Sequence, residues 1–187
     1  MGDAIHVRDI ADFEEYVAVR WSACFRTAYL MTGDRGLAED LVQTALATCY
    51  VAWPKLRARE AADAYVRKAM LNAFLSWRRR KSWGRELSTE VLPETATGDG
   101  LAHVHERPRL RAALAQLPPR QRAAVVMRFY DDLGVHEVAT AMGCSTGTVK
   151  SQTSEGLRKL RVLLGEDIED IGDASATRAA LSTRGMA

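Results

Sequence analysis

The sequence predicts an all-α fold, with two small helical domains joined by a flexible linker. Apolar residues recur at three- and four-residue steps through most of the 187 residues, which is the period of an amphipathic helix. Aromatic residues make up only 7% of the chain, whereas residues that favour helices, chiefly Ala, Leu, Arg and Glu, are plentiful. Alternating strand and helix patterns are absent, and the helical periodicity is interrupted between residues 84 and 106.

Three helices are predicted in residues 10–83. The first covers 12–31, the second covers about 37–53 and ends before Pro54, and the third covers about 61–83. Each carries one apolar stripe, so the three helices can bury one another as a bundle.

Two segments lack this pattern. Residues 84–106 contain proline, glycine, serine and threonine, and five acidic residues against one basic residue, which predicts a linker. Helical periodicity returns over 107–164, the second predicted domain. We expect residues 165–187 to form a disordered tail, which begins with an acidic patch and continues with small polar residues. The acidic residues of this patch are Glu166, Asp167, Glu169, Asp170 and Asp173.

Residues 136–164 have the pattern of a helix-turn-helix. A short helix over 136–142 ends at Gly143, Cys144 is expected to be buried in the turn, and Ser145 can cap a second helix from Thr146 to about Leu164. In such a motif the N-terminal side chains of the second helix contact base edges in the major groove. Here these side chains are of hydrogen-bonding types: Ser145, Thr146, Thr148, Lys150, Ser151, Gln152 and Ser154. The alternative is a helical hairpin with a polar outer face.

A basic run ends the third predicted helix. It comprises Arg78, Arg79, Arg80 and Lys81, between Trp77 and Trp83. Positive charges bind phosphates and aromatic rings stack on bases, so the run suits single-stranded DNA. The alternatives are a solvated helix end favoured by the helix dipole and, for Trp77, burial in the core.

The composition excludes several other classes. The net charge of +2 does not by itself indicate a nucleic-acid-binding protein. Three separated cysteines and four scattered histidines predict neither a disulfide framework nor a metal site, and we expect no cofactor, no enzymatic activity and a cytoplasmic location. Neither a signal peptide nor a membrane-spanning segment is evident.

Motifs in both halves resemble one family. The run Leu117-Pro118-Pro119-Arg120-Gln121-Arg122, with Met142-Gly143-Cys144-Ser145 and Gly147-Thr148-Val149-Lys150-Ser151, resembles the fourth region of extracytoplasmic-function (ECF) sigma factors. Ala38-Glu39-Asp40-Leu41-Val42-Gln43-Thr44-Ala45 resembles the polymerase-clamp-binding helix of region two, and the segment from Ala64 to Asn72 resembles the one that ends in the base-pocket asparagine of the family. The stretch Lys150-Ser151-Gln152-Thr153 is similar to the actinobacterial SigE-like branch.

The resemblance implies a sigma factor that binds core RNA polymerase, at its beta-prime clamp and beta flap, and directs promoter-specific initiation. Residues 10–83 would be region two, which binds polymerase and recognises and melts the minus-ten element. Residues 107–164 would be region four, which recognises the minus-thirty-five element, and an anti-sigma factor is a further implied partner. The implied polymerase contacts are Glu39, Asp40 and Gln43, and the implied minus-ten contacts are Asn72, Trp77, Arg78, Arg79, Arg80 and Lys81.

Other interpretations stay open at this point. The exposed polar positions of the 37–53 helix would also suit an ordinary solvated face. A stand-alone helix-turn-helix activator with an N-terminal helical sensor domain is the main alternative function, and a helical adaptor or anti-sigma-type protein is another. Two residues depart from the family pattern: Gly134 stands where a capping Ser is frequent, and Glu155 stands where an Arg is common.

Overall fold

The computed structural model describes residues 7–56, 59–83 and 108–165, which are helical apart from short turns and contain no strand. This confirms the predicted all-α fold. Side chains are described from residue 11 onward and, in the third helix, up to Trp77. Most of the predicted linker and tail lies outside the described residues. The elements are α1 (Val7–Thr32), α2 (Arg35–Ala52), η1 (Trp53–Lys55), α3 (Arg59–Trp83), α5 (Pro108–Gln116), α6 (Pro119–Val125), η2 (Val126–Tyr130), α7 (Val135–Met142) and α8 (Thr146–Leu164).

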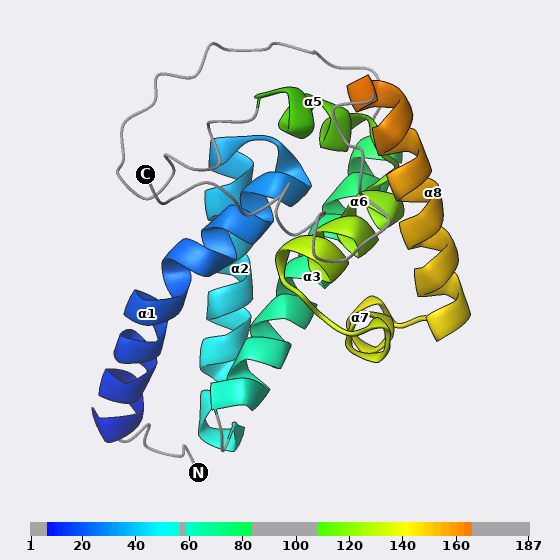
Figure 1. Ribbon diagram of the computed structural model, residues 1–187. Helices are drawn as coiled ribbons and strands as arrows, with labels where there is room; N and C mark the ends of the chain where they lie inside the picture. The colour runs from blue at the N-terminus through cyan, green and yellow to red at the C-terminus, as the bar shows by residue number, and fades with distance from the viewer. Residues whose placement is uncertain (1–6, 57–58, 84–107, 166–187) are drawn as a thin grey trace, which may run out of the picture.

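The helices α1, α2 and α3 form the N-terminal bundle (Figure 1). Gly33 reverses the chain after α1 with a φ of 76°, a conformation that glycine adopts without steric cost. Asp34 then caps α2, because its carboxylate accepts a hydrogen bond of 2.7 Å from the Leu37 backbone N–H. The apolar stripes face one another and bury their largest members completely, among them Tyr29, Leu41 and Phe74.

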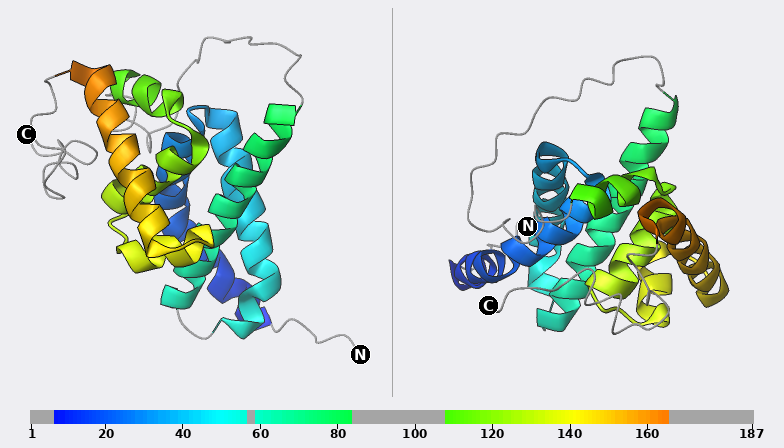
Figure 2. Two further views of the ribbon diagram at one scale, coloured as in Figure 1. Left: turned by 90° about the vertical axis from the view of Figure 1, so that its right-hand side faces the viewer. Right: turned by 45° about the horizontal axis from the view of Figure 1, so that its top comes forward.

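The helices α5 to α8 form the C-terminal unit, in which α8 packs across α6 and α7 (Figure 2). The helix predicted over 121–129 is α6 continued by η2, a π-helical turn. Gly143 ends α7 with a φ of 58°, the usual left-handed helix terminus. Cys144 is half-buried rather than buried as predicted. Its backbone N–H closes the turn by donating to the Ala139 carbonyl at 3.1 Å.

The N-terminal bundle and the C-terminal unit pack against each other, with α1 against α5 and η2, and α3 against α7 (Figures 1 and 2). The Arg122 guanidinium is 2% exposed and donates from Nη1 to the Met31 carbonyl at 2.7 Å, so it joins α6 to the end of α1. The Thr27 hydroxyl donates to Asp131 Oδ1 at 2.6 Å. The residues that make these polar contacts are not part of the apolar stripes. The helical periodicity of the sequence therefore did not predict the contacts.

Candidate DNA and polymerase interfaces

The helix-turn-helix predicted from the sequence is formed by α7, the Gly143 turn and α8. The Ser145 hydroxyl accepts a hydrogen bond of 3.1 Å from the Thr148 backbone N–H, which confirms the predicted cap. The Ser145 and Thr148 hydroxyls also lie 3.0 Å apart, within hydrogen-bonding distance. Both hydroxyls are thus engaged in starting the helix, and this leaves the exposed side chains beyond them as the freer candidates for base contact.

Those exposed side chains lie on the face of α8 that points away from the core. Lys150, Ser151 and Ser154 are exposed, while Thr146 and Gln152 are half-buried. Figures 1 and 2 show α8 on the outer side of α6, away from α1 and α2. The inward face is apolar, as predicted from the periodicity: Val149, Leu157, Leu160 and Leu164 are buried. A polar helix face on the outside of a compact unit has the geometry that major-groove binding requires.

Glu155 lies on this outer face and is exposed. Its carboxylate accepts a hydrogen bond of 2.9 Å from the Arg158 guanidinium one turn further along α8. Glu155, which stands where an Arg is common in the family, therefore places a carboxylate on the outer face of α8. This carboxylate is paired with Arg158 of the same helix.

The polar face of α2 is also open to solvent. Asp40 and Gln43 lie on it, opposite a buried stripe that includes Leu41 and Val42, and both side chains are exposed. Glu39 accepts a hydrogen bond of 3.0 Å from the Arg35 guanidinium. The three residues predicted to bind polymerase therefore lie close together on one helix, with Asp40 and Gln43 accessible to a partner.

The predicted minus-ten residues lie along the C-terminal half of α3. Asn72 is exposed, whereas Trp77 is half-buried and packs against the hydrophobic core. The packing of Trp77 favours its alternative role as a core residue. Arg78, Arg79, Arg80 and Lys81 belong to the last turns of α3, but their side chains lie outside the described part of the structure.

A small cavity lies where the N-terminal bundle meets the C-terminal unit, and no motif or periodicity in the sequence indicated it. The cavity measures about 90 Å3 and is lined by Tyr16, Arg20, Ala23, Cys24, Thr27, Asp63, Arg67, Met70 and Asp131. Burial raises the pKa of Asp131 to about 6, although the hydrogen bond from Thr27 and the charge of Arg67 act in the opposite direction. The second carboxylate oxygen of Asp131, Oδ2, is buried and has no hydrogen-bond partner among the described residues.

The described residues contain no group of His, Cys, Asp and Glu side chains able to hold a metal ion. Burial and the nearby carboxylates of Asp131 and Asp63 raise the pKa of the Cys24 thiol to about 11, so this thiol stays protonated at neutral pH.

None of the described helices is both long and apolar enough to cross a membrane.

Comparison with known proteins identifies both halves of the chain. Residues 20–84 match the family model of sigma-70 region 2, and residues 107–160 match that of sigma-70 region 4. The RNA polymerase sigma-E factor of Streptomyces coelicolor is 38% identical over 162 residues, which cover 86% of this chain and 91% of that protein. The chain belongs to the ECF RNA polymerase sigma factors. It directs transcription initiation as a member of that family and is not an enzyme.

Two further relatives agree with this assignment. The ECF sigma factor SigL of Mycobacterium tuberculosis is 32% identical over 161 residues, with 82% of this chain and 87% of that protein covered. Among solved structures, the sigma factor RpoE of Bartonella quintana, crystallised with the anti-sigma factor NepR, matches with a TM-score of 0.65 and 23% identity. The match covers 82% of this chain and 96% of RpoE, and at this identity it shows a shared fold.

Proposed function

We propose that this sigma factor binds core RNA polymerase through the polar face of α2 and promoter DNA through α8 and the C-terminal half of α3. The observation that carries the proposal is the simultaneous accessibility of Asp40 and Gln43 on α2 and of Lys150 and Ser151 on α8. Because the supporting apolar faces of both helices are buried, these polar side chains have no structural task in the core.

The two DNA-binding elements must separate before they can contact a promoter together. The minus-thirty-five and minus-ten elements are less than two DNA turns apart, which sets a span of up to about 70 Å. In the structure α7 of the helix-turn-helix packs against α3 instead. The segment 84–106 can extend to about 80 Å at roughly 3.4 Å per residue, so its length permits the separation. We infer an opening step in which the contacts of Arg122 and Asp131 with α1 break.

The compact arrangement also suits an anti-sigma partner, which would act by keeping the DNA-binding elements together. Support for this partner comes from RpoE, the structural neighbour, which was crystallised with an anti-sigma factor. We propose that this sigma factor acts in the cytoplasm, where polymerase and promoter DNA reside.

Polymerase binding is tested with the double substitution Asp40→Lys and Gln43→Ala. Pull-down with core polymerase should fall at least about tenfold, while the far-ultraviolet circular dichroism stays native because neither side chain is buried. The matched control is Glu60→Lys with Gln116→Ala, which makes the same change in charge and a similar change in size at exposed positions of α3 and α5. Unchanged pull-down by the α2 variant, with native dichroism, would show that α2 is not the polymerase-binding helix.

Promoter melting is tested with Asn72→Ala. The substitution should impair open-complex formation more than closed-complex binding, because the proposed partner base is accessible only after unpairing. Permanganate footprinting measures the first step and filter binding the second. Equal loss of both steps would argue against a base contact by Asn72.

A further inference from the structure

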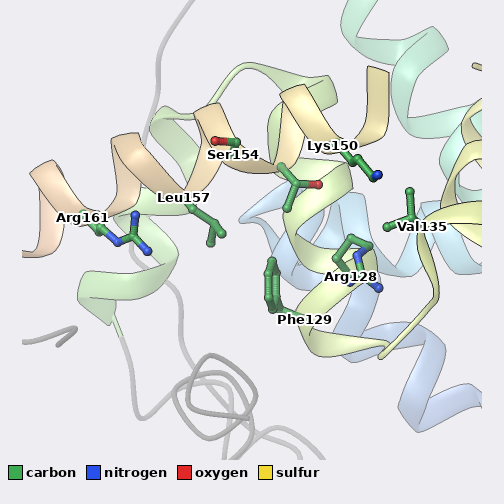
Figure 3. A pocket seen from close by; sticks show the side chains of 8 residues that line it. Arg128, Phe129, Val135, Lys150, Ser154, Leu157 and Arg161 are labelled. Carbon is green, nitrogen blue, oxygen red and sulfur yellow. The ribbon is translucent and has the colours of Figure 1, made fainter. Parts of the chain in front are cut away.

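A pocket beside α8 gathers three positive charges. It measures about 300 Å3, close to the lower end of the range for ligand sites, and its lining residues are Arg128, Phe129, Val135, Lys150, Thr153, Ser154, Leu157 and Arg161. Figure 3 shows Lys150, Ser154, Leu157 and Arg161 along α8, with Arg128 and Phe129 on the wall across from them. None of these lining residues is acidic, so the charges of the pocket are not neutralised from within it.

One buried polar group in the lining is unsatisfied. Thr153 is only 9% exposed, and its hydroxyl oxygen has no hydrogen-bond partner in the described part of the chain. A buried hydroxyl without a partner is costly, and such groups are uncommon in native proteins. The Thr153 hydroxyl is thus an unsatisfied polar group beneath the surface of the pocket.

The walls between the charges are apolar. Phe129 is buried beside Arg128, whose guanidinium lies 5.9 Å from the centre of its ring, and Leu157 is buried on α8. Val135, which contributes a further apolar wall, is half-buried. A complementary occupant must therefore combine carboxylate or phosphate groups with aliphatic side chains.

A segment of this chain outside the described residues has that chemistry. The sequence after α8 is Glu166-Asp167-Ile168-Glu169-Asp170-Ile171-Gly172-Asp173, in which pairs of acids alternate with isoleucines. We propose that residues 166–173 bind in the pocket of Arg128, Lys150 and Arg161. Carboxylates would meet the cations, and Ile168 and Ile171 would meet the apolar walls.

The chain is long enough for this contact. Arg161 lies one turn before the end of α8, whereas Lys150 lies about 21 Å from Leu164 along the helix axis, at 1.5 Å per residue. An extended segment from Gly165 to Asp173 reaches about 27 Å at 3.4 Å per residue. The first acids can therefore reach Arg161, and the last acid can reach Lys150.

The functional consequence rests on the proposed DNA-binding role of α8. Lys150 is one of the side chains proposed to contact the minus-thirty-five element, so a segment bound over it competes with DNA. A tethered competitor acts at a high effective concentration without any partner. If it occupies the pocket in about 90% of free molecules, it lowers the affinity for DNA about tenfold.

Docking is tested without DNA by disulfide trapping. In the full chain with Cys144→Ser, Ser154→Cys is combined with Gly172→Cys and equilibrated in a glutathione redox buffer. The control pairs Gly172→Cys with Ser151→Cys, which is exposed on α8 but outside the pocket lining. We expect at least about tenfold more disulfide at position 154, and a loss of this preference with Arg161→Gln. Equal yields at positions 154 and 151 would overturn the proposal.

Competition is tested by the affinity of holoenzyme for a random-sequence duplex. One variant neutralises the acids at 166, 167, 169, 170 and 173, and its control neutralises the five acids at 86, 90, 94, 99 and 106, which changes the net charge equally. The first variant should bind about tenfold more tightly and the control less than twofold. An equal gain in DNA affinity by the variant and its control would show that the gain comes from net charge alone, and this would overturn the proposed competition. If the disulfide forms selectively at position 154 but neutralising the tail acids leaves the DNA affinity unchanged, residues 166–173 do bind in the pocket. That result would contradict the DNA-binding role of Lys150.

Discussion

Asp131 is the residue whose substitution most directly tests the contact between the N-terminal bundle and the C-terminal unit. Its carboxylate accepts a hydrogen bond from Thr27 through Oδ1, while Oδ2 is buried without a partner among the described residues. An asparagine side chain at this position would have the same shape and keep an acceptor for Thr27, but it would carry no charge. We expect Asp131→Asn to stabilise the compact arrangement at neutral pH.

The magnitude follows from the pKa of the carboxyl group. Burial raises this pKa from 3.8 to about 6 in the compact state, and each tenfold change in proton affinity corresponds to about 1.4 kcal/mol. Ionisation of Asp131 therefore costs the compact state on the order of 3 kcal/mol. This cost already includes the attraction of Arg67. An amide that packs less well than the protonated carboxyl gains less than the full amount, so the expected gain at a pH of about 7.5 is about 1–3 kcal/mol.

The sign of the pH dependence is determined by the raised pKa. The protonated carboxyl is compatible with burial, so its contribution is fully present below a pH of about 4 and is lost as the pH rises to about 6. The asparagine side chain does not ionise, so the variant keeps its stability over this pH range. The difference in unfolding free energy between variant and wild type should therefore be small near pH 4, grow up to about pH 6 and stay constant above it.

Urea unfolding followed by circular dichroism at several pH values between about 4 and 7.5 measures this difference. Asp12→Asn, at an exposed position of α1, serves as the control for the loss of one negative charge. A difference that does not change with pH, or an asparagine variant less stable than wild type near neutral pH, would refute the assigned burial of Asp131 at the contact.

Three further predictions concern single side chains. Gly156→Ala should destabilise the protein by about 1–3 kcal/mol in urea unfolding, because a Cβ would lie 2.7 Å from Val125 Cγ2 and 3.3 Å from the Gln121 carbonyl oxygen; a stability equal to wild type would contradict the close packing of α6 and α8. Arg122→Met should leave the Met31 carbonyl without its donor and increase the radius of gyration in X-ray scattering, whereas an unchanged radius would show that this bond does not hold the two parts together. Glu155→Arg should raise general DNA affinity and steepen its logarithmic salt dependence by about one unit, as one added phosphate contact does; a loss of about tenfold or more on the matched upstream element alone would show that Glu155 contacts a base.

The bounds of α8 could be predicted from the sequence because several local signals coincide there. Ser145 supplies a cap, Val149, Leu157 and Leu160 supply a helical stripe, and Gly165 follows the last turn. The bundle helices were predicted in the same way, although α1 begins at Val7, before its apolar stripe does. Local propensity and periodicity therefore determine where each helix forms.

The contact between the two parts of the molecule could not be predicted in this way. Thr27, Arg122 and Asp131 are polar residues without periodicity, and their partners lie 91 to 104 residues away in the chain. The same holds for the pocket beside α8, since Arg128 and Lys150 come together only when η2 packs near α8. The candidate DNA and polymerase residues could be placed on their helices from sequence motifs, because each motif that carries them lies within a single helix or at its N-cap.

Run-off transcription on a genomic library tests promoter-specific initiation with core RNA polymerase most directly. Purified chain and core polymerase together should give discrete transcripts whose upstream sequences share two elements, and core polymerase alone should give none of them. The variant with Asp40→Lys and Gln43→Ala should abolish these transcripts, while the control with Glu60→Lys and Gln116→Ala should retain them. Discrete transcripts that persist with the α2 variant, or an absence of promoter-dependent transcripts with the native chain, would contradict the account.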